Sequence, residues 1–191
     1  MPAESKRRWH ANDARALQRE DRAWPRYEVI DGELLVTPAP MSPHQFMVGE
    51  LHLELGNYLR RNREAQIWLS PADIQLEVDT TIQPDVFVTP RIRPLPAWAD
   101  IHALLLAIEV LSPSSVRQDR VIKRRFYQRH GVPEYWIVDI DARQIERWRP
   151  DDREPAVVRD SIEWQAPGAS DPLVIELGPI FAECAELVGG E

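Results

Sequence analysis

An apolar run from Leu104 to Leu111, interrupted only by Glu109, limits most strongly how this chain can fold. A short apolar run of this kind is typical of a strand that is buried on both faces of a sheet. An unpaired carboxylate buried in such a strand would cost several kcal/mol or more. Glu109 is therefore expected to be protonated, paired with a cation, or bound to a metal ion.

A second acid, Asp85, has a similar setting at the start of the preceding apolar segment, Pro84–Val88. After Glu109 the chain continues through a helix that we expect to end near His130, and then through a second apolar strand over 135–140. This strand–helix–strand order implies a crossover connection, so the two apolar strands are expected to be parallel neighbours. The pattern predicts an α/β fold with a mixed sheet and helices on both faces.

The remaining segments predict one domain over residues 25–191, preceded by a loosely docked arm over 1–24 with a short helix near 13–20. Asp31-Gly32, between two strand-like runs, predicts a hairpin over 27–36. A helix is expected from Ser42, and alternating polar and apolar residues predict a strand over 73–78.

Composition excludes several classes of protein. The chain has 191 residues, a net charge of −8 and a single cysteine, Cys184, so it holds no intrachain disulfide and no cysteine-rich zinc site. No apolar stretch approaches the roughly 20 residues that a membrane span needs, and the basic N-terminus is not followed by the apolar region of a secretory signal. These features predict a cytoplasmic protein that does not interact with membranes. The charge counts against extensive wrapping of nucleic acid.

The charge is uneven, because Arg117–Arg129 holds six basic residues and one acid. Within this segment Asp119, Lys123 and Tyr127 are spaced at i, i+4 and i+8, which places them on one stripe of a helix. If the helix packs against the sheet, Lys123 can reach the carboxylates at the strand ends. A solvated basic helix face, with an exposed Asp119–Lys123 ion pair, explains the same pattern.

Asp85 and Glu109 could supply the hard oxygen ligands that Mg²⁺ prefers, and the backbone carbonyl of Val110 could add another. A bound metal ion activates water and neutralises charge on a phosphate, while a nearby lysine stabilises developing charge or positions the attacking water. The three side chains Asp85, Glu109 and Lys123 therefore favour metal-dependent hydrolysis of a phosphodiester.

Several segments together resemble the Uma2 family of restriction endonuclease-like proteins, part of the PD-(D/E)XK nuclease superfamily. The closest similarity covers about 27–140, and its parts are Tyr27-Glu28, Asp31-Gly32-Glu33, Ser42-Pro43-His44, Pro84-Asp85, Glu109–Ser115, the Asp119/Lys123/Tyr127 stripe and Gly131–Asp139. The resemblance implies a restriction endonuclease-like core in which Asp85 and Glu109 bind Mg²⁺ or Mn²⁺, and it implies DNA as the substrate.

The superfamily pattern expects a lysine two residues after the second acid, where this chain has Leu111. The resemblance suggests that Lys123 restores the missing charge from the helix. It further implies supporting roles for His44, Asp119 and Tyr127, although a hydrogen bond at a helix end would also explain His44.

Three questions stay open at this stage. Glu28, Glu33 and Glu50 could each join the site, and cleavage of both DNA strands would favour a homodimer by symmetry. Leu111 and the net charge also motivate a second hypothesis, a non-catalytic nucleic-acid-binding or interaction protein that retains the nuclease fold. A glycosidase could use two carboxylates as well, but it would not need Lys123 or the basic helix.

Overall fold

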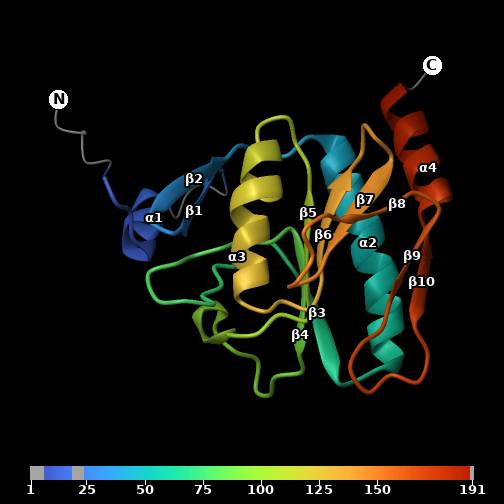
Figure 1. Ribbon diagram of the computed structural model, residues 1–191, viewed down its shortest axis with the longest axis horizontal. Coiled ribbons are helices and arrows are strands. Elements are labelled where there is room, and N and C mark those ends of the chain that lie inside the picture. Colours follow the sequence, from blue (N-terminus) through green and yellow to red (C-terminus); the bar gives the residue numbers. More distant parts are fainter. Residues whose placement is uncertain (1–6, 19–23, 190–191) are drawn as a thin grey trace.

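The computed structural model describes residues 7–18 and 24–189 and is built around a six-stranded mixed sheet (Figure 1). Its strands follow the order β3-β4-β5-β6-β7-β8. They are β3 Ala65–Leu69, β4 Val86–Pro90, β5 Leu106–Val110, β6 Tyr135–Asp139, β7 Gln144–Trp148 and β8 Ala156–Val158. β5 and β6 pair in parallel and every other neighbouring pair of this sheet is antiparallel, which confirms the predicted crossover.

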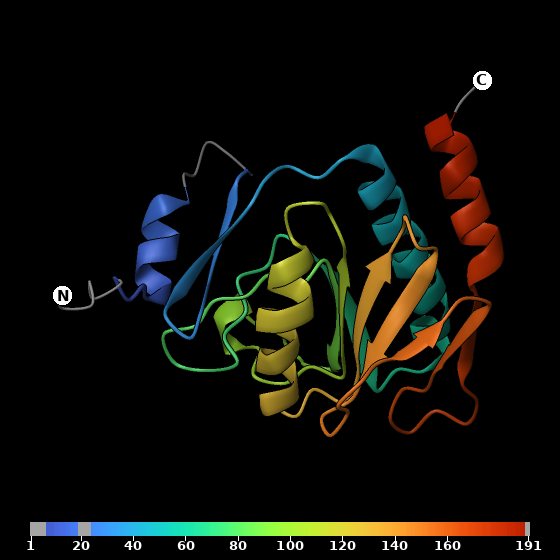
Figure 2. The same cartoon turned by 45° about the horizontal axis from the view of Figure 1, so that its top comes forward.

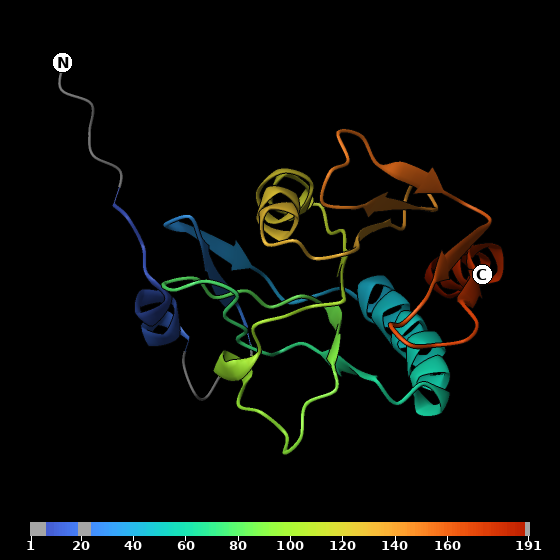
Figure 3. The same cartoon turned by 60° about the horizontal axis from the view of Figure 1, so that its bottom comes forward.

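Helices cover both faces of the sheet, as the α/β interpretation predicted. α2 (Ser42–Arg61) and α4 (Leu177–Gly189) pack together on one face. A π-helical segment, η2 (Gln118–Lys123), runs directly into α3 (Arg124–Arg129) on the other face. Figure 3 shows α2 and α3 on opposite sides of the strands.

Alternation along the central strands divides the hydrophobic core in two. Val86 and Ile108 belong to the cluster that packs against α2. Phe87 and Ala107 belong to the cluster that contains the aromatic residues of α3. Successive side chains of a strand point to opposite faces, so Glu109, two residues beyond Ala107, projects on the α3 face.

The predicted N-terminal hairpin is present as β1 (Arg26–Ile30) and β2 (Glu33–Thr37). Asp31 and Gly32 both have positive φ, 54° and 79°, which the tight turn between these strands requires. α1 (Ala11–Leu17) buries two alanines and contacts β1, so this helix is packed rather than loosely docked. Figure 2 shows this hairpin and α1 at the opposite end of the molecule from α4.

The prediction of a strand over 73–78 needs correction. The segment 73–78 forms no strand, because its backbone makes only an isolated bridge between Ile74 and Ile82. After β8, the strand β9 (Ser161–Trp164) leaves the central sheet and pairs with β10 (Leu173–Glu176). A short 3₁₀ turn, η1 (Trp98–Asp100), lies in the loop before β5.

Within the described residues, none of the helices combines the length and the apolar character that crossing a membrane requires.

Candidate active site

Asp85 and Glu109 lie opposite each other where β4 begins and β5 ends. Val86 pairs with Ile108 in the antiparallel ladder, so the next position outward places Asp85 opposite Glu109. The Val110 N–H donates a hydrogen bond of 3.0 Å to Oδ2 of Asp85 and fixes this carboxylate against β5. Asp85 is 9% exposed and Glu109 is 3% exposed. Two acids that are 24 positions apart in the sequence therefore form one buried pair.

Lys123 reaches this pair from the helix on the α3 face. Its Nζ lies 2.9 Å from Oε1 of Glu109 and 3.8 Å from Oδ1 of Asp119. Lys123 and Asp119 are both buried, so the interpretation of their spacing as an exposed ion pair is wrong. The structure brings Lys123 to the strand-end carboxylates, and its chemical role stays a prediction.

The helix that carries Lys123 has a wide π turn over η2, which ends at this residue. Such turns occur frequently at functional sites because the extra residue in the turn redirects the side chains around it. One turn further on, Tyr127 is also buried, and its hydroxyl donates a hydrogen bond of 3.2 Å to the same Glu109 oxygen that Lys123 contacts. Both contacts use Oε1 of Glu109.

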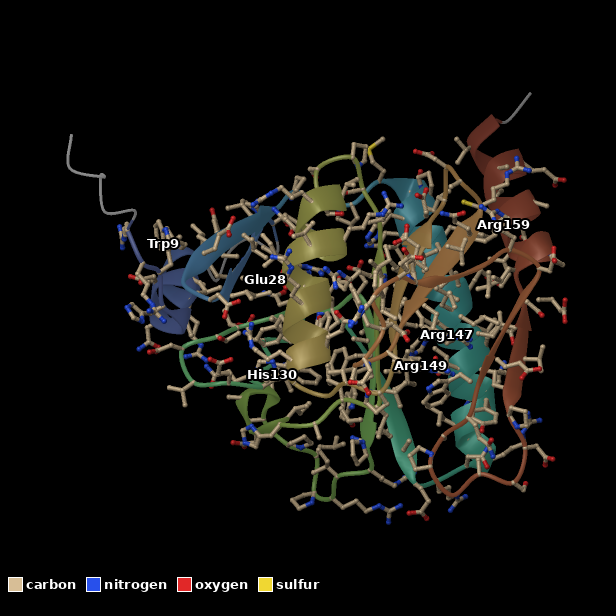
Figure 4. The ribbon with its side chains drawn as sticks, viewed as in Figure 1. Trp9, Glu28, His130, Arg147, Arg149 and Arg159 are labelled. Carbon is tan, nitrogen blue, oxygen red and sulfur yellow. The ribbon has the colours of Figure 1, made fainter. Side chains whose placement is uncertain are left out.

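Glu28 is the N-terminal glutamate that joins the site. Its Oε2 lies 3.0 Å from Nζ of Lys123, and its Oε1 accepts a hydrogen bond of 2.8 Å from the Gln83 N–H. Figure 4 shows Glu28 between the β1–β2 hairpin and α3. Glu33 contacts the exposed Arg117 instead, and Glu50 lies on α2 outside the lining of the cavity described below.

His44, from the first turn of α2, contacts Asp85 directly. Its Nε2 lies 3.1 Å from Oδ2 of Asp85, so an Nε2–H donates to the carboxylate. No hydrogen bond from the His44 ring to the end of α2 occurs among the described residues, so the helix-end explanation is wrong. Burial would raise the pKa of Asp85, but the hydrogen bond and charge of His44, the charge of Lys123 and the Val110 N–H together hold it below its ordinary value.

Glu109 and Lys123 respond differently to this setting. Burial, together with the nearby charges of Asp85, Asp119 and Glu28, raises the pKa of Glu109 well above its ordinary value, although Lys123 opposes this shift. Burial would lower the pKa of Lys123, but the surrounding carboxylates outweigh it and hold that pKa well above its ordinary value. Burial also raises the pKa of Asp119 to about 6. Lys123 therefore stays charged, while the site holds more acids than it can ionise easily.

The site surrounds a cavity of about 250 Å³. Besides the acids and Lys123, it is lined by the connector from Thr37 to Met41 and by the turn from Ser112 to Ser115. It is also lined by Arg26 and Trp24, which sequence reasoning missed. Arg26 is the first residue of β1, and because an arginine at a strand end is normally solvated, no local signal marks it as a site residue.

The donor set fits a divalent cation. Among the residues that the structure describes, the buried charged groups around the cavity are four carboxylates and two cations: Glu28, Asp85, Glu109, Asp119, Arg26 and Lys123. A dication would balance the excess negative charge. Among residues 7–18 and 24–189, however, no three His, Cys, Asp or Glu side chains are arranged as a metal-binding group. Mg²⁺ commonly uses only one or two carboxylates and keeps several waters, so Asp85 and Glu109 suffice as side-chain ligands.

The basic character of the helix is largely neutralised within the protein. Arg120 lies 2.6 Å from both Asp139 and Glu146, and Arg129 lies 2.7 Å from Asp31. Lys123 is buried among the acids described above. The local positive charge that the sequence shows is therefore used mainly for internal ion pairs.

The mixed sheet thus presents two acids at adjacent strand ends, with a lysine beside them. The chain belongs to the Uma2 family, whose description is "Putative restriction endonuclease" and whose sequence pattern matches residues 12–176. The fold is similar to the crystal structure of "a putative nuclease belonging to DUF820" from Anabaena variabilis ATCC 29413. That similarity has a TM-score of 0.70 and 22% identity over 92% of this chain and 98% of the other. None of the curated proteins matches the chain.

Proposed function

We propose that this protein is a metal-dependent endonuclease that hydrolyses phosphodiester bonds of DNA. The observation that carries the proposal is the buried pair of Asp85 and Glu109 at adjacent strand ends, with Lys123 Nζ 2.9 Å from Glu109. Membership in a family described as "Putative restriction endonuclease" supports a nuclease, and the excess of buried carboxylates supports a divalent cation. Cleavage of both strands of a duplex would favour a homodimer.

Asp85, Glu109 and the Val110 carbonyl would hold Mg²⁺ or Mn²⁺. A divalent ion supplies Lewis-acid catalysis, because it stabilises the charge that develops on phosphate and lowers the pKa of water. Lys123 keeps its proton beside Glu109, where its charge stabilises the transition state or positions the attacking water.

His44 and Tyr127 orient the two acids. The His44 Nε2–H holds one oxygen of Asp85, and the Tyr127 hydroxyl holds one oxygen of Glu109. Asp119 contributes a further negative charge next to Lys123 and helps to keep that ammonium charged. Groups of this kind fix ligand geometry and commonly change metal affinity or activity by about 10- to 100-fold when they are removed.

A second candidate is a nucleic-acid-binding protein that retains the fold without catalysis. The observation that favours it is the placement of Lys123 between Glu28 and Glu109, where two carboxylates already satisfy its charge. The Leu111 side chain at the usual lysine position leaves the motif without its normal cation. This candidate predicts that the protein binds a nucleic-acid strand without cleaving it.

Cleavage of supercoiled plasmid and of single-stranded DNA, in Mg²⁺, Mn²⁺ or EDTA, separates the two candidates. We expect metal-dependent cutting that falls at least about 1,000-fold in Asp85→Ala, because the metal contributes several kcal/mol to the transition state. A matched control is Asp139→Ala, which removes an acid at the end of the neighbouring strand β6 outside the cavity.

Thermal unfolding of each variant establishes that it is folded. Equal cutting by the parent and by Asp85→Ala would overturn the site assignment. Binding of both substrates without cutting by the folded parent would favour the non-catalytic candidate.

A further inference from the structure

We propose that Arg26, stacked on Trp24, binds a phosphodiester group of the nucleic-acid strand in the cavity beside Asp85. This inference rests on the proposed nuclease function and assigns the residue that would position the strand. The Arg26 guanidinium lies 3.6 Å from Oδ1 of Asp85, so a phosphate held by Arg26 would lie next to the acids.

The first observation is that the buried guanidinium of Arg26 has no hydrogen-bond partner among the described residues. It is 6% exposed and lines the cavity. Within the described part of the chain its guanidinium donates no hydrogen bond, and Nε is enclosed without a partner. The contact of 3.6 Å with Asp85 is longer than a hydrogen bond. A buried donor left unsatisfied is costly, and a charged one more so, which suggests that a ligand completes this group.

The second observation is that the guanidinium is already held in place. Its central carbon lies 4.0 Å from the centre of the Trp24 ring, so the stack fixes the plane of the group. A planar guanidinium presents paired N–H donors that match two oxygens of a phosphate, and less entropy is lost when such a group is preorganised. Either a carboxylate or a phosphate could accept hydrogen bonds from these donors. A phosphate is the anion on which the proposed nuclease site would act.

If Arg26 has only a structural role, its substitution should change stability and binding in a different way. Its charge could serve only to compensate Asp85, Glu28 and Glu109, all of which act on it electrostatically. In that case removal of Arg26 would destabilise the fold and would leave strand binding unaffected in any folded variant. A ligand-binding role predicts the opposite, with little change in stability and a clear loss of binding.

The experiment measures binding of a fluorescently labelled single-stranded oligothymidylate in Mg²⁺, by anisotropy. All proteins carry Glu109→Gln, so that the strand is not cut during the measurement. Arg26→Met is compared with Arg26→Lys and with the control Arg124→Met. Arg124 also stacks on a tryptophan, Trp148, at 4.7 Å but lies outside the cavity. A second strand with methylphosphonate linkages has the same shape without the phosphate charges.

We expect Arg26→Met to weaken binding of the phosphodiester strand about 10- to 100-fold, as loss of hydrogen bonds to a charged group would do. Arg26→Lys should recover part of this loss, and Arg124→Met should bind like its parent. The methylphosphonate strand should bind weakly and equally to all variants. Thermal unfolding should change little between Arg26→Met and its parent.

Three results of the strand-binding assay would overturn the inference: equal strand binding by Arg26→Met and its parent, an equal loss in Arg124→Met, or a loss that also affects the methylphosphonate strand. Titration with inorganic phosphate distinguishes the source of the anion, because Arg26-dependent binding of free phosphate without strand binding would also contradict it. Plasmid cleavage by the protein without Glu109→Gln is scored separately. If Arg26→Met cuts the plasmid as well as the parent does, the nuclease proposal stands and the proposed role of Arg26 is wrong.

Discussion

The two faces of the central sheet use the same strands for different purposes. Toward α2, Val86, Ile108 and Val110 are packed among apolar side chains. Toward α3, the neighbouring positions Asp85 and Glu109 are charged and line a cavity. Adjacent residues of one strand thus differ completely in chemistry, because side-chain direction alternates along the strand.

The two faces therefore contribute differently to the stability of the fold. The α2 face has the properties of an ordinary core, in which the free energy of burial increases with apolar area. On the α3 face, carboxylates that are costly to bury are concentrated around Lys123, and the pKa values of Glu109 and Asp119 are raised as a result. Clusters of strongly shifted titratable groups in a cavity are characteristic of functional sites.

The largest expected effect comes from Lys123→Met, which removes the central cation of the charged face. We expect a loss of about 4 kcal/mol in the free energy of unfolding, because Glu28 and Glu109 would lose the buried cation that compensates them. Urea unfolding near neutral pH measures this loss. Lys123→Met combined with Glu109→Gln should recover part of it, since one of the unpaired acids is then absent. If the double variant is no more stable than the single one, the loss does not come from the unpaired carboxylate of Glu109.

A smaller effect on stability is expected from substitutions at two neighbouring positions of β5, one on each face of the sheet. Ile108→Ala should cost about 3 kcal/mol of stability, because it leaves a void in the core beneath α2. Glu109→Gln should leave stability unchanged or higher, since it removes a buried charge while the amide keeps the shape. The order of the two variants is the opposite for activity: folded Ile108→Ala should still cleave, whereas Glu109→Gln should not. Urea unfolding paired with the plasmid assay tests both, and similar destabilisation by the two substitutions would contradict this division of the sheet.

The parts of the fold that follow from local pattern were predictable. The hairpin around Asp31-Gly32 and the parallel pair β5–β6 are confirmed, because turn chemistry and crossover geometry are nearly independent of context. The segment 73–78 shows that a sequence pattern alone does not establish a strand. Its alternation of polar and apolar residues resembles a strand, yet the chain there pairs only at Ile74 with Ile82. Strand formation depends on an available partner edge, which alternation does not reveal.

The site was predictable to the same extent. Asp85 and Glu109 could be named because a charge inside an apolar run is costly. Helical spacing placed Lys123 on one stripe with Asp119, but its role came from the resemblance to the family. Glu28 could not be chosen over Glu33 and Glu50, since the choice depends on how the hairpin packs against α3. The π turn of η2 was not predictable either, because intrinsic helix propensities do not distinguish α from π winding.

The smallest expected effect is a pH dependence that arises from Asp119 on the charged face. The pKa of Asp119 is raised to about 6 in the folded protein from 3.8, so between these values the folded state binds a proton more readily than the unfolded state. Stability must therefore fall as the pH rises through this window. From pH 5 to pH 7 we expect a loss of about 1.4 kcal/mol from this group. Asp119→Asn should remove that part of the pH dependence, measured by urea unfolding at each pH.

The control for this prediction is Asp139→Asn, which alters an acid outside the cavity that is paired with Arg120. It should leave the slope between pH 5 and pH 7 unchanged, because the titration that matters belongs to the crowded acids around Lys123. An unchanged slope in Asp119→Asn would show that the pKa of Asp119 is not raised by burial on this face. A reduced slope in both variants would mean that the pH dependence comes from the ion pairs of the whole helix rather than from the candidate site.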